Sequence, residues 1–154
     1  MKLRTMIKVC AVLLTIITLV LSRPDFRDKI PSGYRVPNPC RIPATWNPVG
    51  HYNPEHFTSI KNPFGLDFRD NDFKWNATLC KKDSDRDGMT NGDELGDPDC
   101  KWRPGQQTYN PVGHPGICEP IGDPSCLYQR FKCDCMENCD GLYGDITYPG
   151  SIGK

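Results

Sequence analysis

Beyond Ser22 the chain has no apolar run long enough to cross a membrane, and over the whole chain neither sign of charge is in excess. It carries 19 basic and 19 acidic residues. This balance argues against nucleic acid or an anionic membrane surface as a partner. Strongly acidic repeats and glycine-rich tracts, typical of mineral-templating proteins, are also missing. These absences favour a diffusible globular protein.

Catalytic signatures are equally scarce. The chain has three histidines, His51, His56 and His114, and no residue context that resembles an activated serine or cysteine nucleophile. Its densest group of carboxylates has the spacing of a metal-coordination loop rather than of an acid–base pair. The sequence therefore predicts that the protein is not an enzyme.

The segment from Met1 to Ser22 has the pattern of a secretory signal peptide. Three basic residues precede an apolar run that ends at Leu21, and Ser22 stands at the −1 position of a cleavage site. The alternative, a membrane anchor, needs a longer run of about 20 apolar residues. Cleavage leaves segment 23–154, which has a slight excess of acidic residues. This segment is long enough for one small domain and an appendage. We therefore expect a secreted, extracellular protein.

The most informative stretch is the twelve-residue segment 83–94, Asp-Ser-Asp-Arg-Asp-Gly-Met-Thr-Asn-Gly-Asp-Glu. A calcium loop needs carboxylates at positions 1, 3 and 5, a glycine at 6, a main-chain carbonyl at 7, a water-bridging polar side chain at 9 and a bidentate glutamate at 12. These positions are filled, in order, by Asp83, Asp85, Asp87, Gly88, Met89, Asn91 and Glu94. We therefore predict a single EF-hand-like loop that binds Ca2+; a solvated acidic turn is the alternative.

The flanks of the loop limit the kind of site. Upstream, a short helix is expected over residues 73–82, with Asp72 as its N-cap. Downstream, Gly96 and Pro98 end any helix about one turn after Glu94. Because there is neither a long exit helix nor a second loop, we expect a structural extracellular site with an affinity on the order of 0.1 to 1 mM.

Eight cysteines remain after cleavage, an even number that is typical of a disulfide framework in a short secreted chain. They are Cys40, Cys80, Cys100, Cys118, Cys126, Cys133, Cys135 and Cys139. Zinc binding by the last three is the alternative for that cluster. The chain is also rich in glycine and proline, with 14 and 15 of them. This richness favours a loop-rich chain ordered by cross-links and metal.

The fold expected from these features is a small, disulfide-rich, mostly irregular α+β domain. It should contain one or two short helices and a few short strands. The aromatic residues of segment 62–68, together with Trp75, Leu79 and Leu95, are expected to form one small apolar cluster.

Two further motifs leave alternatives open. Asn76-Ala77-Thr78 is an N-glycosylation sequon, and a glycan on Asn76 requires that side chain to face water. The segment 47–51 recurs in sequence as 110–114, which places His51 and His114 in matching turns. The two histidines share a copper or zinc ion in one interpretation. In the other, each imidazole bonds nearby backbone.

Several runs around the loop resemble the temptin family. They are residues 33–40, 49–51, 62–68, 75–80 and 82–105, and the resemblance covers about Ser32 to Pro120. Members of this family are secreted, and a molluscan member belongs to a water-borne protein pheromone blend. The resemblance therefore implies a signalling role through a receptor or other extracellular protein partners. The alternative is a structural protein of an extracellular or shell matrix.

The resemblance also divides the chain and its cysteines. It implies a signal peptide (1–22), a flexible lead-in (23–31), a temptin-like calcium-binding domain (32–120) and a cysteine-rich, weakly EGF-like extension (121–154). The domain would hold the first four mature cysteines. A bound ion draws the loop ends together, so Cys80 is expected to pair with Cys100, and Cys40 then with Cys118. In the extension, Cys133 and Cys135 are each expected to pair with Cys126 or Cys139.

Overall fold

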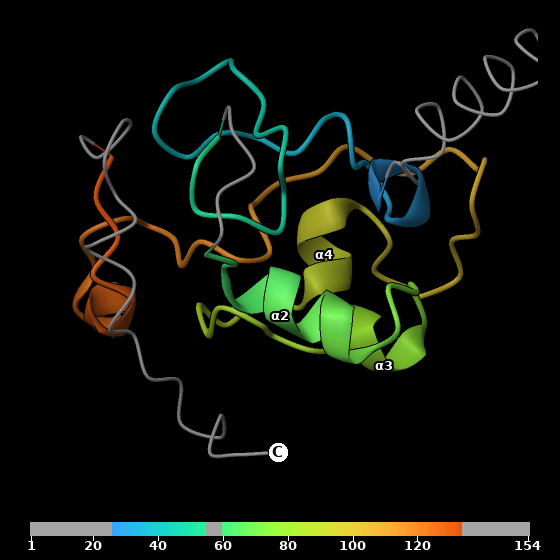
Figure 1. Ribbon diagram of the computed structural model, residues 1–154. Coiled ribbons are helices and arrows are strands. Elements are labelled where there is room, and N and C mark those ends of the chain that lie inside the picture. The colour runs from blue at the N-terminus through green and yellow to red at the C-terminus, as the bar shows by residue number, and fades with distance from the viewer. Residues whose placement is uncertain (1–25, 55–59, 134–154) are drawn as a thin grey trace, which may run out of the picture.

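The computed structural model describes residues 26–54 and 60–133 (Figure 1). Three short α-helices lie together near its centre: α2 (Pro63–Asp70), α3 (Ala77–Cys80) and α4 (Asn91–Leu95). Two 3-10 helices, η1 (Phe26–Lys29) and η2 (Pro124–Gln129), lie on opposite sides of this group. Long irregular segments connect them.

Helices are more numerous, and extended pairing is scarcer, than the sequence suggested. Among the described residues, extended segments pair only in two isolated bridges, Pro37 with Thr45 and His51 with Lys61. The prolines that recur through residues 37–54 explain this difference, because a proline has no N–H to give to a strand ladder. The fold is small and irregular, as expected, but the predicted short strands are absent from the described part.

Helix α2 begins where the sequence supplies both a cap and a compatible first residue. Asn62 is the N-cap, and its side-chain oxygen accepts from the N–H of Gly65 at 2.9 Å. Pro63 follows at the first helical position, where its missing N–H costs nothing. Gly65 lies so close to Gly50 that a Cβ on it would be 2.0 Å from the Gly50 carbonyl oxygen. This contact joins α2 to the 47–51 turn.

The helix expected over residues 73–82 is much shorter, and Asp72 is not its cap. Asp72 and Phe73 both have a φ of 54°, because they close the end of α2 instead. The N–H of Phe73 donates to the Phe68 carbonyl at 2.9 Å, a bond that is typical of a helix C-terminus. Asn76 is the N-cap of α3. As predicted, α4 ends at Gly96, which has a φ of 79°.

The core is one cluster of buried apolar side chains packed around α2. Its buried members are Ile30, Val36, Trp46, Val49, Tyr52, Phe64, Phe68, Leu79, Leu95 and Ile117. Part of the predicted flexible lead-in belongs to it: the ring of Phe26 stacks on Phe73 at 4.8 Å, and Ile30 is buried. Residues of segment 26–31 therefore contact the core of the domain.

The start of the predicted extension also packs against the domain, which changes the expected disulfides. The Phe131 ring lies 6.0 Å from that of Trp46 and 6.2 Å from that of Tyr52. This packing brings Cys133 to Cys40, and the two form a disulfide.

The predicted partners of Cys40 and Cys133 were therefore wrong. Cys118, the expected partner of Cys40, pairs with Cys126 instead. Cys135 and Cys139 lie outside the described residues, as does the predicted signal peptide.

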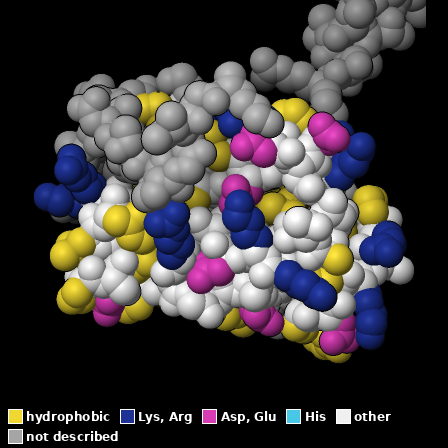
Figure 2. Space-filling model, turned by 90° about the horizontal axis from the view of Figure 1, so that it is seen from below, with side chains coloured by type: hydrophobic (Ala, Val, Ile, Leu, Met, Phe, Trp, Pro, Cys, Tyr) yellow, Lys and Arg dark blue, Asp and Glu magenta, His cyan; other side chains and the backbone are white. Residues whose placement is uncertain are grey.

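The surface of the domain carries mixed charge. On the face seen in Figure 2, basic and acidic side chains are interspersed with apolar ones, and no patch of one sign covers its described residues. None of the helices in the described ranges has the length and the apolar character that a membrane crossing needs.

Candidate metal centre

The segment 83–94 begins after α3 and continues into α4, which starts at Asn91. Residues 83–90 form a closed loop between the two helices, because the N–H of Asn91 donates to the Lys82 carbonyl at 2.7 Å. Thr90 is the N-cap of α4, and its hydroxyl oxygen accepts from the N–H of Asp93. The exit helix is therefore fixed directly against the last turn of the loop.

The backbone of the loop turns sharply at Gly88, the glycine at position 6. Gly88 has a φ of 100°, a conformation that residues with a Cβ rarely adopt. Its N–H donates to Asp83 Oδ2 at 3.0 Å, and the N–H of Met89 donates to Asp87 Oδ1 at 2.8 Å. These bonds orient the first and third carboxylates of the loop toward its interior.

The three aspartates of the loop converge. Each of Asp83, Asp85 and Asp87 offers an oxygen, and these oxygens all lie within 4.8 Å of one another, whereas Glu94 is not part of this close group among the described residues. Asp85, Asn91 and Glu94 are completely buried. Within the described residues, six buried side-chain oxygens of this group have no hydrogen-bond donor: Asp83 Oδ1, both of Asp85, Asn91 Oδ1 and both of Glu94.

The electrostatics of the group follow from this burial. Loss of water raises the pKa of Asp85 to about 8, and the charges of Asp87 and Asp83 add to the effect. Loss of water raises the pKa of Glu94 to about 11, and the charge of Asp85 adds to it. Negative charge is thus unfavourable here unless a cation balances it. Buried carboxylate and amide oxygens without donors fit a hard divalent cation, which prefers oxygen ligands.

The predicted ligand Asn91 is held in a fixed orientation. Its expected bridge to the ion through water stays a prediction, and its side chain is buried at the start of α4. Its Nδ2 donates to the Leu79 carbonyl at 2.7 Å and to Ser84 Oγ at 2.9 Å. Both bonds fix the amide so that its oxygen, the group without a donor, faces away from α3 and Ser84.

One supporting residue was not found from the sequence. Asp67 on α2 accepts from Ser84 Oγ at 2.7 Å and forms an ion pair with Lys82. These contacts attach the loop to α2, which lies well upstream of the first ligand in the chain. No local spacing connects Asp67 with the loop, because the contact depends on how α2 packs against it.

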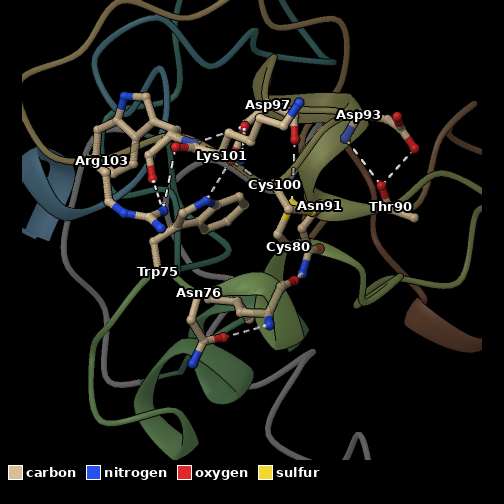
Figure 3. Close-up of a disulfide and its surroundings, with 12 residues drawn as sticks. Trp75, Asn76, Cys80, Thr90, Asn91, Asp93, Asp97, Cys100, Lys101 and Arg103 are labelled. Carbon is tan, nitrogen blue, oxygen red and sulfur yellow. Dashed lines mark hydrogen bonds between the residues drawn. A yellow bond between two sulfur atoms is a disulfide. The ribbon is translucent and has the colours of Figure 1, made fainter.

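A disulfide closes the base of the loop (Figure 3), as predicted. Cys80, the last residue of α3, is bonded to Cys100. Gly92 of α4 packs on this bond: a Cβ at Gly92 would lie 2.4 Å from the Cys80 sulfur. Beside the disulfide, Asp97 accepts from the indole N–H of Trp75 at 2.9 Å. Constraining a ring of this size contributes about 3 kcal/mol to the free energy of unfolding.

The two histidines of the repeated segment both bond backbone. An imidazole nitrogen of His51 lies 3.2 Å from the Ile60 carbonyl oxygen. The Nδ1 of His114 accepts from the N–H of Gly116 at 3.1 Å. His114 is completely buried, and burial lowers its pKa to about 3. These contacts agree with the repeated-turn interpretation, and a shared copper or zinc ion stays a prediction.

Comparison with known proteins places the chain in a family. The profile of the temptin C-terminal family matches residues 20–117, which include the whole loop. The chain is 43% identical over 98 residues to Temptin of Aplysia californica, an alignment that covers 62% of this chain and 78% of the relative. No solved structure matches the chain. The chain thus belongs to the temptin family.

Proposed function

We propose that the protein is a secreted, calcium-binding component of a water-borne chemical signal, which acts on an extracellular receptor or protein partner. The observation that carries the calcium part is the set of six buried oxygens in segment 83–94 that have no donor in the described part of the chain. Membership of the temptin family supports the signalling part. Three disulfides among the described residues suit an oxidising, extracellular compartment.

In this proposal the calcium ion has a structural task. Carboxylates at loop positions 1, 3, 5 and 12 and the main-chain carbonyl of Met89 would hold it, with the amide of Asn91 at position 9. The ion neutralises charges that otherwise repel one another inside the domain. It therefore stabilises the junction of α3 and α4, to which the Cys80–Cys100 disulfide and α2 are also attached.

Calcium is expected to stabilise the folded protein reversibly. With an affinity on the order of 0.1 to 1 mM, about 10 mM Ca2+ raises the free energy of unfolding by about 1.4 to 2.7 kcal/mol. Chelation should lower the melting temperature, and added Ca2+ should restore it. Circular dichroism melts in chelator and in Ca2+, together with calorimetric titration of the native protein, measure both effects.

The control variants identify the binding residues. The double variant Asp83→Ala/Glu94→Ala should lose the response to Ca2+. Asp99→Asn removes an exposed carboxylate outside the loop and should keep it. If the double variant still shifts with Ca2+, the ion binds elsewhere. If the native protein takes up no Ca2+ at millimolar levels, the calcium part of the proposal is wrong.

The signalling part is tested by where the protein is found. Release into surrounding water or with eggs is the expected result for a diffusible signal, and antibody detection in conditioned water measures it. Recovery only from demineralised matrix would contradict the proposal and favour a structural role.

A glycan on Asn76 is a further part of the proposal. Asn76 is exposed; its Oδ1 caps α3 by accepting from the Leu79 N–H at 3.0 Å, and its Nδ2 is on the other side of the amide. Glycosidase treatment of the secreted protein should reduce its mass. The variant Thr78→Ala removes the sequon and keeps the cap, so it should show no such reduction and the same fold. An unchanged mass of the native protein after treatment would refute the modification.

A further inference from the structure

Glu119 lies well beyond the end of the loop in sequence, yet the fold connects it with Glu94 of the loop through a shared turn. The connection is the turn at Val112, Gly113 and His114. The N–H of Val112 donates to the Glu94 carbonyl at 2.8 Å. Gly113 lies against the Glu94 carboxylate, since a Cβ on it would be 2.9 Å from Oε1.

The next residue of the same turn holds Glu119. The N–H of His114 donates to Glu119 Oε1 at 3.1 Å. The carboxylates of Glu94 and Glu119 therefore contact two consecutive residues, Gly113 and His114. Glu119 itself follows Cys118, which is fixed by its disulfide to Cys126.

The charge of Glu119 acts on the same group of carboxylates. Burial raises its pKa, and the charge of Asp87 raises it further. In turn, its charge adds to the effects that raise the pKa values of Asp85 and Glu94. Five carboxylates thus interact electrostatically, although only four of them belong to the twelve-residue segment.

We propose that Glu119 is a fifth carboxylate of the calcium site, held in place by the His114 N–H, and that its negative charge strengthens the binding of the divalent cation. This inference rests on the calcium binding proposed above. The affinity of oxygen sites for Ca2+ rises with the number of charged groups around the ion. Because Glu119 lies outside the loop, its interaction with the ion also couples the conformation of residues 112–119 to Ca2+ binding.

The variant Glu119→Gln tests the charge alone. Its amide oxygen can still accept from the His114 N–H, so the turn keeps its hydrogen bond. Removal of one negative charge near the ion is expected to weaken Ca2+ binding about fivefold. Calorimetric titration with Ca2+ at constant ionic strength measures the change. Asp99→Asn, an exposed carboxylate outside the site, is the matched control and should change the affinity less than twofold.

A second measurement separates this role from a structural one. Without Ca2+, Glu119→Gln relieves repulsion, so its melting temperature in chelator should equal or exceed that of the native protein. A lower melting temperature in chelator, together with unchanged affinity, would show a structural role and overturn the inference. Equal Ca2+ affinity of native protein and variant overturns it while the calcium proposal stands. If the native protein binds no Ca2+, both fail.

Discussion

Replacement of Asn62 with alanine is expected to lower the free energy of unfolding by about 3 to 4 kcal/mol. Asn62 is completely buried and uses its whole amide. Its oxygen caps α2, and its Nδ2 donates to the carbonyls of Val49 at 2.8 Å and His51 at 3.1 Å. The variant loses the cap, worth about 1 kcal/mol, and leaves a buried carbonyl of Val49 without its donor.

The protein contains its own control for this prediction. Asn76 is also an N-cap, but it is exposed, and its Nδ2 bonds the Asn71 side chain. Asn76→Ala should therefore cost only about 1 kcal/mol, the loss of a cap alone. Urea unfolding followed by tryptophan fluorescence, on protein from a host without N-glycosylation, compares the two. Similar losses in both variants would mean that the bonds to Val49 and His51 contribute nothing.

Features of the fold that depend on neighbours in the chain were predicted from the sequence. They are the turn at Gly88, the end of α4 at Gly96 and the Cys80–Cys100 disulfide. Each follows from a backbone requirement or from a loop that brings its own ends together. The convergence of Asp83, Asp85 and Asp87 is likewise a consequence of their spacing.

Predictions of features that depend on packing were missing or wrong. The expected helix from residue 73 failed because the Phe73 N–H closes the end of α2 and its ring stacks on Phe26, far away in the sequence. The partner of Cys40 was wrong because Phe131 packs on Trp46 and draws Cys133 inward. Nothing in the spacing of cysteines encodes that aromatic contact. The ion itself stays a prediction.

The buried His114 is expected to make the protein less stable in acid. Its pKa is about 3 in the folded protein, against about 6.5 when it is exposed. The folded ring is neutral, with Nδ1 accepting from Gly116 and Nε2 buried without a partner among the described residues. Below pH 6.5 the unfolded chain gains a proton that the folded protein does not, so stability falls as the pH is lowered. At pH 4.5 this costs about 2 to 3 kcal/mol.

The variant His114→Gln isolates this effect. The raised pKa values of Asp85 and Glu94 have the opposite sign in the metal-free protein, because those carboxyls bind protons more tightly when folded. Glu119, which faces the His114 N–H, also titrates. The quantity to measure is therefore the difference between native protein and variant in chelator, from urea unfolding at pH 7.5 and pH 4.5. The difference in the free energy of unfolding should shift by about 2 to 3 kcal/mol in favour of the variant at the lower pH.

If the variant does not fold, the NMR ring resonances of His114 in the native protein test the prediction instead. They should not titrate between pH 8 and pH 5. A ring that gains a proton in that range while the protein stays folded would show that burial does not hold it neutral.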